Sequence, residues 1–71
     1  MKVIKTVHLQ YIDETSDKVW EGTLYENDDV LCAWGRYGNT LQSKLFPKAG
    51  EAFLDKKQNE KLKKGYEIVE N

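Results

Sequence analysis

Apolar and polar residues alternate along most of residues 3–46, a pattern typical of strands with one buried face. Short polar stretches rich in Asp, Asn and Glu, with one Gly, interrupt the alternation and favour turns. The alternating runs are Val3–Ile12, Lys18–Tyr25, Val30–Tyr37 and Thr40–Phe46. Because short connections favour neighbouring antiparallel strands, the sequence predicts an antiparallel meander.

The alternation also predicts which side chains share a face of the sheet. On the third strand, Cys32, Trp34 and Arg36 lie on one face. Trp34 and Arg36 are then one strand step of about 6.6 Å apart, which favours partial exposure of Trp34, although a buried tryptophan is the alternative. We expect Trp20 and Cys32 to be core residues. We also expect Tyr37 to be buried, on the face opposite Trp34.

After Pro47 the apolar spacing becomes helical. Ala49, Ala52, Phe53 and Lys56 form one stripe, and its small residues predict a helix that lies close to one face of the sheet. The fold class predicted is therefore α+β, a small antiparallel sheet with one helix packed on it.

The residues after this stripe predict an interrupted helix. Leu62 lies about half a turn from Phe53 on a continued helix, so we expect a break or tightening near Asn59 that returns Leu62 to the core. Gly65 is a helix-stop signal, and residues 66–69 predict a short closing strand.

Length and composition place this chain among small soluble proteins. It has 71 residues, enough for one domain spanning residues 1–71, and a net charge of −1. No apolar run approaches the roughly 18 residues of a membrane-spanning helix. These features predict a cytoplasmic domain that does not interact with membranes. Cys32 is the single cysteine, which excludes an internal disulfide.

The sequence offers little that catalysis would use. It contains no phosphate-binding loop and no Ser/His/Asp set at recognisable spacing. Cys32 and His8 supply too few ligands for zinc, and they form a nucleophile and base only if the fold brings them together. We therefore expect no enzymatic activity, no cofactor and no metal.

Charge is divided unevenly along the chain. Residues 1–30 carry three lysines against seven acidic residues, a net charge of −4. Residues 31–71 carry one arginine and seven lysines against five acidic residues, a net charge of +3. A positive face in the second half would attract a phosphate backbone. The alternative is that the lysines of residues 56–64 only complement the dipole at a helix end.

The segment Trp34-Gly35-Arg36-Tyr37-Gly38 carries the clearest recognition chemistry. It holds the only arginine of the chain, whose planar group of donors suits phosphates, carboxylates and base edges. Trp34 beside it offers a face on which a sugar or base stacks. Arg36 paired with a surface carboxylate is the structural alternative.

Together with other positions, this segment resembles the WGR domain, a module of poly(ADP-ribose) polymerases and of bacterial proteins that include molybdate-metabolism regulator-like ones. The likeness covers nearly the whole chain. It rests on Asp17-Lys18-x-Trp20, on residues 34–38, and on Gln42, Phe46, Ala52, Lys61-Leu62 and Gly65-Tyr66. Leu41 departs from the family, which usually has glycine there.

The resemblance implies a function in DNA binding. It implies that Trp34 packs on the sugar at a DNA break end and that Arg36 helps couple DNA binding to neighbouring domains. We therefore expect a nucleic-acid-binding module that prefers DNA ends or breaks. The residues expected to bind are Trp34, Arg36, Lys44, Lys48, Lys56 and Lys57. The alternative is a protein-interaction adaptor that uses Trp34 and Arg36 as anchors.

Overall fold

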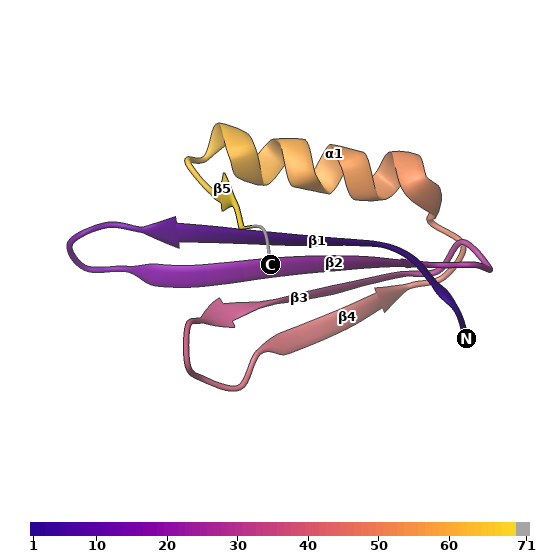
Figure 1. Ribbon diagram of the computed structural model, residues 1–71, viewed down its shortest axis with the longest axis horizontal. Coiled ribbons are helices and arrows are strands. Elements are labelled where there is room, and N and C mark those ends of the chain that lie inside the picture. The colour runs from indigo at the N-terminus through magenta and orange to yellow at the C-terminus, as the bar shows by residue number, and fades with distance from the viewer. Residues whose placement is uncertain (70–71) are drawn as a thin grey trace.

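A five-stranded antiparallel sheet, with one helix lying across one of its faces, makes up the protein (Figure 1). The computed structural model describes residues 1–69. The elements are β1 (Val3–Ile12), β2 (Asp17–Tyr25), β3 (Val30–Arg36), β4 (Gln42–Phe46), α1 (Gly50–Lys63) and β5 (Glu67–Ile68). In space the strands follow the order β4-β3-β2-β1-β5. The predicted α+β class and the four-strand meander are confirmed, and β5 adds a short strand beside β1.

The ends of β3 and β4 differ from the predicted runs. β3 ends at Arg36, and β4 begins at Gln42 rather than Thr40. The prediction of a buried Tyr37 is wrong, because Tyr37 lies in the turn after β3 and is 64% exposed. Its backbone N–H still donates to the carbonyl oxygen of Asp17 at 2.9 Å, so the turn is tied to the start of β2.

The core lies between the sheet and α1. Strand register places the alternating apolar residues of β1, β2 and β3 on the face that the helix covers. The buried residues are Val7, Leu9, Trp20, Leu24, Val30, Cys32 and Leu54. Trp20 and Cys32 are each only 3% exposed, as expected of core residues. Burying one such aliphatic or aromatic side chain stabilises the fold by roughly 1.5–3 kcal/mol.

The helix packs in a different register from the predicted stripe. Its anchor is Leu54, which is 0% exposed, and Phe53 packs beside it as a partly buried residue. Ala52 is exposed, so its expected contact with the sheet is wrong. The expected break near Asn59 is also wrong, because α1 is continuous and Leu62 reaches the core from within it. Leu62 lies only about 80° from Leu54 around the helix, which explains why no break is needed.

The helix end is fixed by Gly65, as the sequence predicts. Gly65 has a φ of +102°, a conformation that favours glycine. Its N–H donates to the carbonyl oxygen of Leu62 at 3.1 Å, and the Tyr66 N–H donates to that of Lys61 at 3.1 Å. The chain then enters β5. No helix within residues 1–69 has the length and apolar character needed to cross a membrane.

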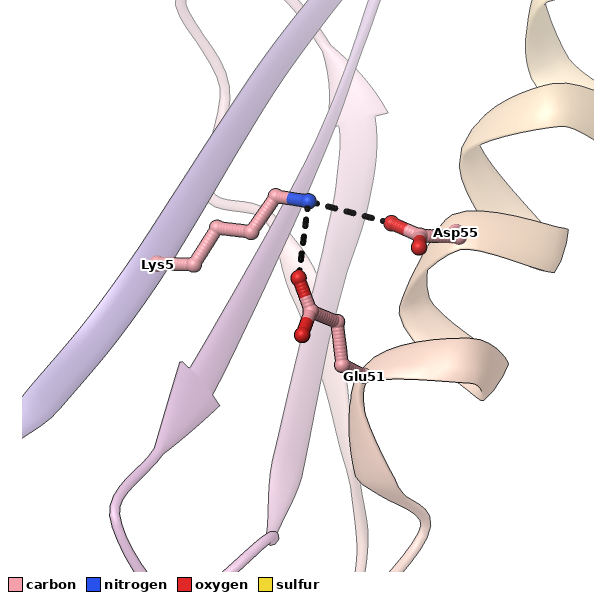
Figure 2. A network of polar contacts seen from close by, with 3 residues as sticks. All are labelled: Lys5, Glu51 and Asp55. Carbon is pink, nitrogen blue, oxygen red and sulfur yellow. Dashed lines mark hydrogen bonds and ion pairs between the residues drawn. The ribbon is translucent and has the colours of Figure 1, made fainter.

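An ion-pair network connects the start of α1 to β1 (Figure 2). The Nζ of Lys5 lies 3.0 Å from Oδ1 of Asp55 and 3.5 Å from Oε2 of Glu51. The hydrogen bond to Asp55 raises the pKa of the Lys5 ammonium. Because all three side chains are well exposed, the network contributes no more than about 1 kcal/mol per pair.

Candidate nucleic-acid interface

A pocket between one flank of α1 and the strands contains Trp34. It has a volume of about 280 Å³ and will be called the Trp34 pocket. Its sheet side is formed by Trp20, Cys32, Trp34 and Phe46, and its helix side by Lys57, Glu60, Lys61 and Lys64. Trp34 is partly buried, so one part of its ring packs on the core while another part faces the pocket.

A second pocket adjoins the first beneath the end of the helix. It has a volume of about 400 Å³ and will be called the Tyr66 pocket. Its lining residues are Tyr11, Asp13, Ser16, Lys18, Lys61, Lys64 and Tyr66. Lys61 and Lys64 line both pockets. The two pockets therefore share a border formed by these two lysines, and together we call them the cationic groove.

The lysines of the cationic groove crowd one another. Within residues 1–69, Lys18, Lys61 and Lys64 form no ion pair, whereas Lys57 lies 3.6 Å from Oε1 of Glu60. Removal from water lowers the pKa of the Lys61 ammonium, and the positive charges of Lys64 and Lys57 lower it further. A cation held near other cations gains from the arrival of an anion, so the groove has the electrostatics of an anion-binding surface.

Aromatic rings hold several of these ammonium groups in place. Lys61 Nζ lies 5.5 Å from the centre of the Tyr66 ring, and Lys18 Nζ lies 5.8 Å from that of Tyr11. The two tyrosine rings contact each other with centroids 5.6 Å apart. Each cation–π contact of this kind contributes roughly 0.5–1 kcal/mol at an exposed site. The rings thus offset part of the repulsion between the lysines.

The acidic residue of the Tyr66 pocket is already engaged. Asp13 accepts backbone N–H groups from Thr15 at 2.8 Å and Ser16 at 2.7 Å, and the hydroxyl of Tyr11 at 3.0 Å. These hydrogen bonds, the Thr15 backbone contact first, lower the pKa of the Asp13 carboxyl. Asp13 therefore stays ionised at the edge of the pocket, and its negative charge offsets part of the positive charge of Lys18, Lys61 and Lys64.

Four of the six residues predicted to bind lie at or beside the groove. Trp34 and Lys57 line the Trp34 pocket. Lys44 pairs across strands with Cys32, one of the residues that form the sheet side of that pocket, and therefore lies on the same face. Arg36 is exposed at the end of β3 and pairs with Lys18, which brings two cations side by side at the edge of the Tyr66 pocket.

The remaining two predicted residues lie elsewhere. Lys48 is at the opposite end of β3 from Arg36, where its Nζ donates to the carbonyl oxygen of Asn27 at 3.0 Å. Lys56 lies on the outer side of α1 among Ala52, Asn59 and other solvent-facing residues. The six residues therefore do not form one continuous patch.

Three groove lysines were missed by the sequence reasoning, namely Lys18, Lys61 and Lys64. Lys61 is three residues before Lys64, a spacing that puts both on one side of a helix, and this was an available signal. Their meeting with Lys18 was not readable, because it depends on α1 returning across the sheet toward the end of β1 (Figure 1).

The structure separates the two residues considered for nucleophilic chemistry. Cys32 is buried beneath the helix, and burial raises the pKa of its thiol. His8 lies on the other face of the sheet, where Nδ1 is 3.0 Å from Oε2 of Glu21. Among residues 1–69, no three His, Cys, Asp or Glu side chains gather as they would around a metal ion.

Comparison with known proteins found no match. No family model fits this chain, and neither a curated protein nor a solved structure similar to it was found. The resemblance to the WGR domain thus stays a prediction carried by its motif residues.

Proposed function

We propose that this domain binds DNA through the cationic groove, preferentially at strand ends or breaks. The observation that supports the proposal most is the concentration of Lys18, Lys57, Lys61 and Lys64 around a partly exposed Trp34 in a chain whose net charge is −1. A cluster of lysines on one face is the electrostatic feature that attracts a nucleic-acid backbone.

The two pockets bind different parts of the DNA strand. Lys18, Lys61 and Lys64 hold phosphate oxygens in the Tyr66 pocket, and these contacts position the strand without reading its sequence. Trp34 contacts a sugar or base in the neighbouring pocket, a stacking contact that contributes roughly 1–3 kcal/mol. An intact duplex hides its base faces, so only an end, a nick or a single strand presents one to Trp34.

Other depressions on the surface suit nucleic acid less well. The pocket beside the edge of β1 has a volume of about 500 Å³, and its one lysine, Lys5, is already held by Glu51 and Asp55. The described residues that line it include no Phe, Tyr or Trp, and Nδ1 of its His8 lies 3.0 Å from Oε2 of Glu21. It therefore lacks the free cation and the large stacking face that the Trp34 pocket offers.

The test is a comparison of ends under controlled salt. Fluorescence anisotropy measures binding to a labelled single strand, a blunt duplex, a nicked duplex and a duplex closed by hairpins at both ends. We expect weak binding at low salt that favours the first three probes over the closed duplex and falls steeply as salt rises. Equal affinity for the closed duplex would reject the preference for ends.

A test of Trp34 requires a substitution that preserves its packing on the core. Trp34→Leu retains an apolar side chain against the core but removes the stacking face. We expect it to weaken end binding about tenfold while the closed duplex is bound as before. Circular dichroism and thermal melting control for loss of fold.

A protein-interaction role is the second candidate, and a different observation favours it. Large apolar side chains are exposed along β1 and β5, namely Val3, Ile4, Ile12, Ile68 and Val69. Such exposed apolar residues near a strand edge are typical of a protein-binding surface. Binding there would change little with salt, so the same salt titration separates the two functions.

A further inference from the structure

One carboxylate lies among the lysines of the Trp34 pocket. Glu60 is the acidic residue among the described residues that line it, and its side chain is 46% exposed. Its Oε1 lies 3.6 Å from Nζ of Lys57, one helical turn earlier. Glu60 also borders the pocket on the outer side of α1, so it lies at the rim of the Trp34 pocket, where Lys57 holds its carboxylate on the side of that pocket.

A carboxylate in this position treats the two kinds of strand terminus differently. An ionised carboxylate only accepts hydrogen bonds, and a sugar hydroxyl is a donor. A terminal phosphate carries a charge of about −1.5 to −2 at neutral pH and is repelled. Lys61 and Lys64 border both pockets, so they attract phosphates toward the Tyr66 pocket as well as toward Trp34.

We infer that Glu60 is a specificity-determining residue of the groove, which disfavours a terminal phosphate at Trp34 and favours a terminal sugar with a free hydroxyl. This inference rests on the proposed DNA binding. In the arrangement it describes, the last sugar of a strand lies against Trp34 beside Glu60. The internucleotide phosphates that follow lie along Lys61, Lys64 and Lys18.

The test removes the charge and keeps the shape, with Glu60→Gln. Two single strands of the same sequence are compared, one ending in a hydroxyl and one in a phosphate, at each of the two ends in turn. Glu60→Gln also releases Lys57, which raises the affinity for every phosphate. The ratio of the two dissociation constants is therefore measured in a Lys57→Gln background, with and without Glu60→Gln, so that a released Lys57 does not contribute to its shift. We expect this ratio to shift about threefold to tenfold toward the phosphate-terminated strand.

A matched control separates a local effect from net charge. Glu51→Gln changes the net charge equally but lies nine residues earlier on α1, about 13.5 Å away along the helix axis. We expect Glu51→Gln to change the affinity for both strands by the same factor and to leave the ratio of their dissociation constants unaltered. A ratio that Glu60→Gln leaves at the parent value, or that Glu51→Gln shifts equally, overturns the role of Glu60 while DNA binding stands. A parent protein that binds neither strand at low salt overturns both proposals.

Discussion

Gly22 lies directly beneath Leu54, so the helix rests on a strand position that has no side chain. A Cβ on Gly22 would collide with Cδ1 of Leu54 and would lie 2.8 Å from Cη2 of Trp20. Leu54 is fully buried at this point. The absence of a side chain at Gly22 therefore lets α1 approach β2 closely at Leu54.

The first prediction follows from this contact. Gly22→Ala should destabilise the domain by about 1–3 kcal/mol, because overpacking outweighs the usual gain of replacing glycine in a strand. Urea denaturation followed by circular dichroism measures the change. The double variant Gly22→Ala with Leu54→Ala should lose less free energy of unfolding than the sum of the losses of the two single variants, because the Cδ1 atom that collides is gone. Full additivity would mean that the two residues do not meet.

The second prediction concerns the register of the helix. Leu54→Ala should cost about 2–5 kcal/mol, and Phe53→Ala should cost less than Leu54→Ala, because Phe53 is only partly buried against Phe46 at a centroid distance of 4.8 Å. Ala52→Glu should change stability by no more than about 0.5 kcal/mol, because Ala52 faces solvent. Thermal and urea denaturation measure the loss of stability in each of the three variants. A large loss from Ala52→Glu would restore the register predicted from the sequence.

The third prediction uses two adjacent lysines as a matched pair. Lys57→Gln should weaken DNA binding and reduce the salt slope by about one ion, because Lys57 lines the Trp34 pocket. Lys56→Gln removes the same charge from the outer side of α1 and should leave binding close to that of the parent. Anisotropy titrations across a salt series measure both. Equal losses would point to net charge rather than to the groove.

The fourth prediction links Lys61 to stability and pH. Its pKa is lowered in the folded protein, so its charged form opposes folding at neutral pH. That opposition is fully present below the folded pKa and is relieved as the pH rises through it toward the ordinary value of 10.5. Lys61→Met keeps the apolar stem but loses the cation–π contact with Tyr66, so it should raise stability at pH 7 by no more than a few tenths of a kcal/mol (about 0.3). Melting curves across pH should show this advantage shrinking in alkali.

Much of the fold was readable because the strands follow a two-residue period, apart from a register shift between Val3 and Lys5. That period put Trp34 on the face of Arg36 and so predicted its partial exposure, whereas the burial of Trp20 and Cys32 was predicted from their residue types. The helix was less readable, because the residues that share the inward side with Leu54 include Lys57 and Lys61. Because lysines occupy inward positions, the true buried side of the helix did not stand out as apolar. The stripe with Ala49, Ala52 and Phe53 therefore fitted a buried face better in the sequence.

The groove was less predictable than the strands. Lys18 lies in β2, whereas Lys61 and Lys64 lie at the end of α1, so these lysines meet only in the folded chain. The alternation of the sequence extended to Tyr37 and predicted its burial, but β3 ends at Arg36, one residue before it. Where strands end and where a helix crosses are tertiary properties that local periodicity does not contain.

The most direct test of DNA binding at the groove is an NMR titration of the labelled protein with a short single-stranded DNA at low salt. If DNA binds at the cationic groove, chemical-shift changes should be concentrated at the Trp34 indole, Lys57, Lys61 and Lys18. These changes should reverse as salt is added. Residues at the opposite end, such as Lys48, should stay unchanged. Shifts gathered instead on Ile4 and Ile68 along β1 and β5, or no shifts at all, would contradict it.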